Sequence, residues 1–154
     1  MRGERVHIPR GLGRKLCATA PSRFTQHARN PERSVQVGGD ATVFVPAYGS
    51  PFVHDMERGR RYATLADFEN FVKLTYLQPH LHHSGGTVCE PVDLPVNKRH
   101  FDMVAAHLRL SDKPFMGGVY GEQAANETIK AASIVFGSIE EMAERPPFIS
   151  ILGS

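Results

Sequence analysis

One stretch organises the fold of this chain: residues 80–95, HLHHSGGTVCEPVDLP. A short run of apolar and ring-bearing side chains ends in a Gly-Gly pair. A loop with the carboxylates Glu90 and Asp93 follows between two prolines, and a helical pattern begins directly after it. Strand, acidic loop and helix are the order expected at the functional end of a βα unit, because parallel sheets and barrels bind ligands at the carboxyl ends of their strands. We therefore predict a strand from residue 81 and a loop that forms one wall of a pocket.

The same plan repeats on both sides of this stretch. The strands that we predict begin at residues 42, 81, 114 and 148, and the last three starts are 33 and 34 residues apart, which is the size of a βα unit. Helical patterns over residues 64–77, 97–110 and 124–136 alternate with them, and a short acidic helix covers 139–143. Thr64 and Asp67 predict a capping box at the start of the first helix, and Asn97 can cap the second. This alternation predicts a parallel α/β architecture. Because a complete TIM (β/α)8 barrel takes about 250 residues, we expect a partial barrel, about half, truncated after its fourth strand.

The first forty residues have a different pattern. Pro9 suits the first turn of a short helix that runs to about Ala20. Two alternating segments, residues 23–28 and 34–37, flank an Asn-Pro turn and predict a β-hairpin. We therefore divide the chain into an N-terminal helix and hairpin region, 1–40, and the partial barrel, 41–154.

Composition excludes several classes of protein. The chain has 154 residues, a net charge of +2 and 41% hydrophobic residues, as expected for one ordinary globular domain. No apolar run approaches the ~20 residues of a membrane span, and no signal peptide is visible. The basic clusters lack interleaved aromatic residues, which argues against nucleic acid. Two distant cysteines predict no disulfide, and we expect a cytoplasmic protein.

Four blocks of sequence together resemble one family. They are residues 24–32 with the Gly38-Gly39 pair, residues 64–70, residues 90–95 and residues 112–117. In this order and spacing they resemble the trimethylamine methyltransferase family, the corrinoid-dependent amine methyltransferases, from residue 6 to residue 154. The resemblance implies a TIM barrel that presents a methylated amine, such as trimethylamine or glycine betaine, to the cobalt of a separate corrinoid protein. It also implies a role in methanogenesis.

The resemblance also carries expectations about the extent and partners of the chain. The chain corresponds to the N-terminal part of the family's barrel, so we expect a fragment that is inactive alone. The position of pyrrolysine, which some members use, lies outside it. The corrinoid (cobalamin) would come from the partner protein and not be bound directly, and a homo-oligomer remains open. The alternatives are a non-catalytic half-barrel and another TIM-barrel enzyme, such as a lyase acting on an anion.

Candidate substrate-binding residues follow from the chemistry of a methylated ammonium. Its methyl groups cannot donate N–H hydrogen bonds, so aromatic faces, worth up to about 2 kcal/mol each when desolvated, are its natural partners. The candidates at strand ends are Tyr48, Phe115 and Tyr120, and the carboxylates Asp55 and Glu90 could offset the charge. Phe115 could equally be a core residue, and the acids, Asp93 above all, could serve as helix caps. No catalytic residue is assigned.

Histidine and cysteine side chains are the usual ligands of zinc, and this stretch contains both. Adjacent residues of a strand point to opposite faces, so His82 and His83 could not both reach one metal. We therefore predict no metal, a neutral hydrogen-bonded histidine and an inert Cys89 thiol. A lyase site would need a basic residue near the strand ends. The nearest candidates, Lys98 and Arg99, are better interpreted as helix surface.

Overall fold

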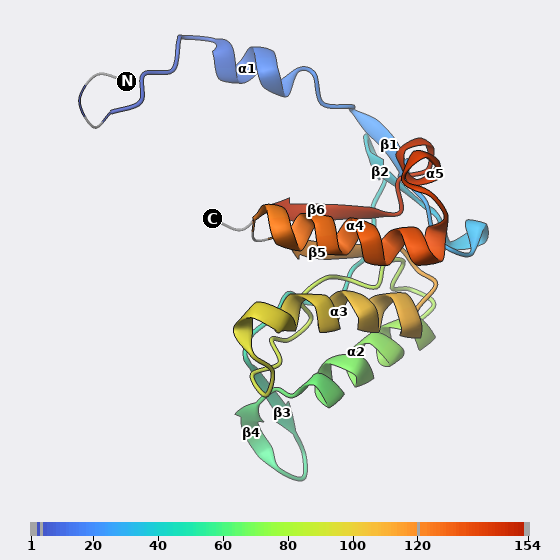
Figure 1. Ribbon diagram of the computed structural model, residues 1–154. Helices are drawn as coiled ribbons and strands as arrows, with labels where there is room; N and C mark the ends of the chain where they lie inside the picture. The colour runs from blue at the N-terminus through green and yellow to red at the C-terminus, as the bar shows by residue number, and fades with distance from the viewer. Residues whose placement is uncertain (1–2, 4, 120, 153–154) are drawn as a thin grey trace.

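The computed structural model describes residues 3, 5–119 and 121–152 (Figure 1). Five α-helices, one 3-10 helix and six strands occur within those residues. In chain order they are α1 (Leu12–Cys17), β1 (Arg23–Gln26), η1 (Pro31–Arg33), β2 (Val35–Gly38), β3 (Phe52–Asp55), β4 (Gly59–Tyr62), α2 (Leu65–Leu77), α3 (Val96–Leu110), β5 (Phe115–Val119), α4 (Glu122–Phe136), α5 (Ile139–Glu144) and β6 (Phe148–Leu152).

Three helices form a layer beside one parallel strand pair. Helix α2 packs on α3, and α3 packs on α4. Strands β5 and β6 are parallel, in a register that runs from Phe115 opposite Phe148 to Val119 opposite Leu152. The helix between them, α4, lies along the pair, and the three helices begin on the side where β5 and β6 end (Figure 1). The chain therefore contains one complete βαβ unit, and the predicted α/β class is confirmed.

Two of the four predicted barrel strands are wrong, because residues 41–50 and 81–90 have no strand structure. The second segment still lies between its expected neighbours. The backbone N–H of His82 donates to Phe44 O at 3.0 Å, that of Ser84 to Pro114 O at 2.8 Å, and that of Met116 to Gly85 O at 2.7 Å. Gly85 has a φ of +85°, which bends the segment out of the extended conformation. Among the residues described, the only sheets are two-stranded, and they do not confirm the partial barrel.

The predictions of the first hairpin and of the helices agree more closely with the structure. The first hairpin forms as an antiparallel pair of β1 and β2, from Arg23 opposite Gly38 to Gln26 opposite Val35. Helices α2, α4 and α5 lie close to their predicted bounds. Helix α3 begins directly after Pro95 and not at an Asn97 cap. Strands β3 and β4 form a second antiparallel pair, from Phe52 opposite Tyr62 to Asp55 opposite Gly59.

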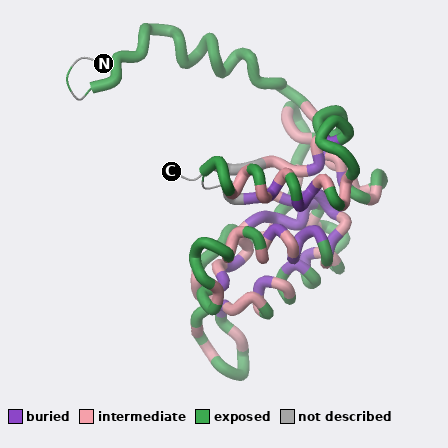
Figure 2. Tube along the Cα trace, in the orientation of Figure 1, coloured by how far each residue is buried: buried purple, intermediate pink, exposed green. Residues whose placement is uncertain are grey.

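The hydrophobic core has two clusters on either side of α3 (Figure 2). The first cluster connects β3 to α2 and α3. Its largest members are Phe68 and Val72, both fully buried. The second lies between α3, β5 and α4 and is centred on Phe115. No helix among the described residues has the length and apolar character needed to cross a membrane.

Helix α2 begins with a capping box, as its sequence predicted. Asp67 accepts hydrogen bonds from the Thr64 backbone N–H at 2.9 Å and from the Thr64 hydroxyl at 2.7 Å, and Thr64 Oγ1 accepts from Asp67 N–H at 3.3 Å. Arg61 donates to both oxygens of the carboxylate at 2.6 and 2.7 Å. These hydrogen bonds, that of Arg61 first, hold the pKa of Asp67 far below its usual value.

Removing this carboxylate should weaken the start of α2. We expect Asp67→Ala to lower the free energy of unfolding by about 1–2 kcal/mol, because it removes the cap and leaves Arg61 without its bidentate partner. Urea denaturation followed by circular dichroism measures the change. Glu57→Ala, at an exposed turn residue, is the matched control, and an equal loss in the two variants would contradict the role of the cap.

Candidate functional site

Two loops meet near the start of α3, and we name residues 46–51 and 86–93 together the loop pair. The backbone N–H of Glu90 donates to Ser50 O at 3.1 Å. Gly49 approaches the second loop so closely that a Cβ there would lie 2.3 Å from Thr87 O. Only glycine permits this contact. The acidic stretch and the tyrosine-bearing loop, predicted separately from sequence, are therefore brought together.

Glu90 forms an ion pair with Arg99 in the first turn of α3. Arg99 Nη1 lies 2.5 Å from Glu90 Oε1, and Nη2 donates to Leu94 O at 3.2 Å. The Arg99 side chain is only 13% exposed and that of Glu90 is 46% exposed. The interpretation of Arg99 as helix surface is therefore wrong. Its charge is matched by Glu90, so it gives little support to a lyase that acts on an anion.

The other candidates on these loops differ in their surroundings. Tyr48 is 56% exposed on the loop pair, so burial in the core does not account for it, and it is available to a ligand. Asp93 accepts from the backbone N–H of Leu65 at 2.9 Å and so acts at the start of α2. The sequence placed Asp93 before α3, but that helix has no side-chain cap, and Asp93 bonds to α2 instead.

Asp55 is engaged in the turn between β3 and β4. Its carboxylate accepts from the backbone N–H of Arg58 at 2.6 Å and of Glu57 at 3.0 Å, and it pairs with Arg61 at 3.2 Å. These bonds, the one from Arg58 first, lower its pKa. The carboxylate therefore lies with Arg61 and its partner Asp67, and its hydrogen bonds are those of a structured turn.

Phe115 lies in the core. It is 1% exposed, and its ring stacks between those of His107 and Phe148 at centroid distances of 5.6 and 5.5 Å. Phe115 is therefore a core residue, which is one of the two positions that its sequence allowed. Tyr120, the remaining aromatic candidate, lies outside the described residues.

A buried histidine network that the sequence did not reveal supports the second loop from behind. His107 Nε2 is 2.9 Å from Gly86 O, and Nδ1 is 2.8 Å from Ser84 Oγ. Because a carbonyl oxygen can only accept, we assign the proton to Nε2, and Ser84 then donates to Nδ1. Burial lowers the pKa of His107 to about 4. His107 is therefore neutral and fixes the backbone at Ser84 and Gly86.

Two histidines of the stretch, His82 and His83, are hydrogen-bonded too. His83 Nδ1 accepts from Gly85 N–H at 2.9 Å, and burial lowers the pKa of His83 to about 4. His82 Nδ1 accepts from Phe44 N–H at 3.2 Å. Cys89 is buried, and burial raises the pKa of its thiol to about 12, which agrees with the expected inert thiol. No group of three His, Cys, Asp or Glu side chains within the described residues is placed to hold a metal.

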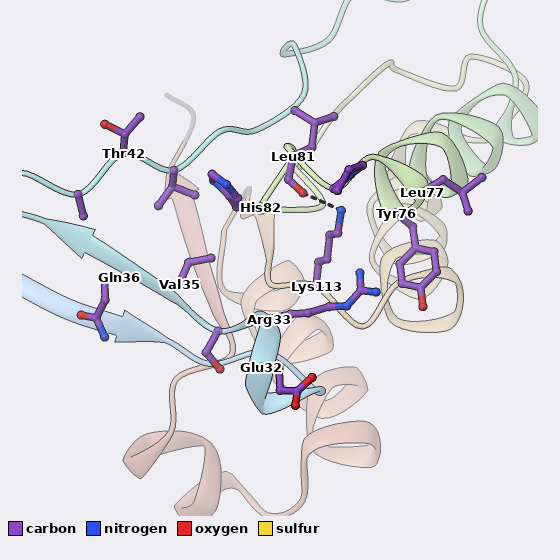
Figure 3. A pocket seen from close by; sticks show the side chains of 14 residues that line it. Glu32, Arg33, Val35, Gln36, Thr42, Tyr76, Leu77, Leu81, His82 and Lys113 are labelled. Carbon is purple, nitrogen blue, oxygen red and sulfur yellow. Dashed lines mark hydrogen bonds between the residues drawn. The ribbon is translucent and has the colours of Figure 1, made fainter.

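A groove of about 700 Å³ lies beside the residues that precede β5 in the chain, and none of its lining residues belongs to the loop pair (Figure 3). Lys113 lies on its wall and donates to three backbone carbonyls, Thr75 O and Gln78 O at 2.8 Å and Leu81 O at 2.6 Å. Arg33, also on the wall, lies 3.2 Å from Asp112. Arg33 is therefore paired with a carboxylate, and carbonyls take up the three N–H donors of Lys113, which leaves Lys113 no donor for an anion.

Comparisons with known proteins agree with the four sequence blocks. A family model described as trimethylamine methyltransferase (MTTB) matches residues 1–153. A glycine betaine methyltransferase of Desulfitobacterium hafniense (strain Y51) is 41% identical over 152 residues, which are 99% of this chain and 32% of that relative. The chain therefore spans about a third of the length of the curated relative it matches, and the resemblance drawn from the sequence is confirmed.

Proposed function

Because this chain belongs to the trimethylamine methyltransferase family, we propose that the protein containing it transfers a methyl group from a quaternary amine of the glycine betaine type to a corrinoid protein. The observation that carries this choice of substrate is the 41% identity to a glycine betaine methyltransferase. We also propose that the βαβ unit of β5, α4 and β6 is part of a TIM barrel. The hydrogen bonds that place residues 82–85 between Phe44 and β5 support that proposal.

The reaction breaks one C–N bond of the ammonium. The electron pair of that bond stays on nitrogen, so the quaternary ammonium group becomes a neutral tertiary amine. The corrinoid, a co-substrate brought by its own protein, would supply the reduced cobalt that takes the methyl group. The protein's part is to hold the ammonium in line and to exclude water.

Residues of the loop pair are suited to holding the ammonium group of the substrate. Tyr48 presents an accessible aromatic ring, and such a ring attracts a methylated cation through its face. Glu90 places a carboxylate on the same loop pair, and Arg99 fixes its position while matching much of its charge. We propose Tyr48 as the substrate contact and Glu90 as a weaker electrostatic contribution.

Methyl transfer by the full-length protein tests this proposal. We expect glycine betaine to methylate reduced cobalamin at least about tenfold faster than trimethylamine, a difference of about 1.4 kcal/mol in activation free energy. Methylcobalamin is followed by absorbance and dimethylglycine by mass spectrometry. For Tyr48→Leu we expect KM to rise by about 5–30-fold, whereas Tyr48→Phe keeps an aromatic face and should change KM much less. Failure of every methylated amine to react would overturn the proposed function.

A further inference from the structure

The N-terminal segment, which we name the arm and define as residues 5–22, has the character of an interaction surface. Every described residue before Phe24 is exposed. The arm extends away from the rest of the chain and carries helix α1 (Figures 1 and 2). Its large apolar side chains are among the most exposed in the protein, at 72% for Val6, 71% for Ile8 and 59% for Leu16. Leu12 and Leu16 lie on one face of α1, since they are four residues apart.

The charge of the arm limits the kind of partner that it fits. It has four basic side chains and no acidic one; they are Arg5, Arg10, Arg14 and Lys15. Basic residues alone would suit nucleic acid, but the arm contains no Phe, Tyr or Trp on which bases could stack. The interleaved apolar residues instead favour a protein surface that is both apolar and acidic.

The same chain carries such a surface at α5. We name it the α5 patch and define it as Ile134, Ile139, Glu140, Ala143 and Glu144, all of which are exposed. Ile134 is 86% and Ile139 58% exposed, and helices α4 and α5 that carry them pack together. These two adjoining helices therefore expose two apolar side chains and two carboxylates, a combination that complements the arm.

The root of the arm lies close to this patch. The backbone N–H of His27, one residue after β1, donates to Pro146 O at 2.8 Å, and Pro146 follows α5 closely. The last two residues of the arm, Pro21 and Ser22, lead into β1. A proline at this position favours an extended connection over a tight reversal of the chain. In a two-fold pair of chains each arm could cross near its root onto the other chain. An exchange of this kind is a low-cost route to a dimer.

We propose that the arm docks on the α5 patch of a second copy of this chain and that two copies exchange their arms. This inference concerns assembly and does not rest on the proposed methyl transfer. The arm's Leu12 and Leu16 would pack on Ile134 and Ile139, and its basic residues would face Glu140 and Glu144.

Cys17 allows a direct test because it is exposed at the end of α1, whereas Cys89 is buried. Two versions of the full-length protein are made with different tags. One keeps Cys17, and the other carries Cys17→Ser with Ala143→Cys in the patch. After the two are mixed and mildly oxidised, we expect disulfide-linked species with both tags. Ala66→Cys, at an exposed alanine of α2, is the matched control, and the version without an added cysteine sets the background.

We expect Ala143→Cys to give at least about ten times more two-tag product than Ala66→Cys, a preference of about 1.4 kcal/mol. Sedimentation equilibrium should show dimers that Leu16→Glu weakens by a similar factor. Glu140→Lys with Glu144→Lys should also weaken them, and Arg10→Glu with Arg14→Glu added should restore them. Equal cross-linking at the two sites, a disulfide only within one chain, or association that Leu16→Glu leaves unchanged would overturn the proposal.

Discussion

Replacing Lys113 by methionine is expected to lower the free energy of unfolding by about 3 kcal/mol. Lys113 is 6% exposed, and its ammonium group donates to three backbone carbonyls. Two of them, Thr75 O and Gln78 O, belong to the end of α2, where helical carbonyls lack partners and the helix dipole favours a cation. Methionine has a similar length but no donor, so the variant removes all three hydrogen bonds. Thr75 O and Gln78 O then keep only the longer bonds from the backbone N–H groups of Gln78 and Leu81, both at 3.3 Å.

Urea denaturation of the Lys113→Met variant measures the loss, and Lys73→Met is its control. Lys73 is an exposed lysine of the same helix α2, and its replacement should change stability by no more than about 0.5 kcal/mol. Hydrogen exchange adds a local measurement, because amides in the last turn of α2 should lose protection only in Lys113→Met. Similar losses in the two variants would show that the three hydrogen bonds contribute little.

This lysine illustrates what the sequence could not reveal. Its acceptors lie 32 to 38 residues earlier in the chain, and no local pattern marks such a pairing. Gln26 is a similar case, because its buried side chain donates to Phe115 O, 89 residues away. By contrast, the capping box of α2 and the first hairpin depend on neighbours within a few residues, and both were predicted.

The two missing strands have a related explanation. The alternation of strand-like and helical segments predicted the helices α2, α3 and α4 and the strands β5 and β6 in their correct order. Whether a segment forms a regular ladder depends on its neighbours, and residues 82–86 make only isolated hydrogen bonds to theirs. Gly85 lies close against Pro46, since a Cβ on Gly85 would be 2.5 Å from Pro46 Cγ. Its positive φ was not expected from the sequence.

In the candidate site, too, the sequence indicated the type of residue but not its surroundings in the fold. Residue chemistry selected Tyr48 and Glu90 among the candidates, and the structure brings the loops that carry them into contact. Burial then separates the candidates, because Phe115 lies between two rings of the core while Tyr48 is accessible. Arg99 was misjudged because its position in the first turn of α3 gives no indication that Leu94 and Glu90 fold back over it.

Acidification is expected to destabilise the protein below about pH 6.5 through two buried histidines. Burial holds the pKa of His107 and of His83 at about 4 in the folded state, against about 6.5 in an unfolded chain. Between these values the unfolded chain binds more protons, so stability rises with pH and is lost as pH falls through the window. Each histidine should contribute a loss of about 2 kcal/mol between pH 7 and pH 5.

His107→Gln separates this effect from the titration of carboxylates. Glutamine keeps one donor and one acceptor, which can serve Gly86 O and the Ser84 hydroxyl, but it does not titrate. The variant should therefore lose about 2 kcal/mol less stability than the parent between pH 7 and pH 5, whatever its stability at pH 7. His54→Gln, at an exposed histidine, should follow the parent. If His107→Gln followed the parent as well, His107 would have to be protonated in the folded state, and its hydrogen bond from Ser84 would then be broken. Stability measured by urea denaturation at each pH distinguishes these outcomes, because the neutral ring is what connects α3 to the backbone of residues 84–86.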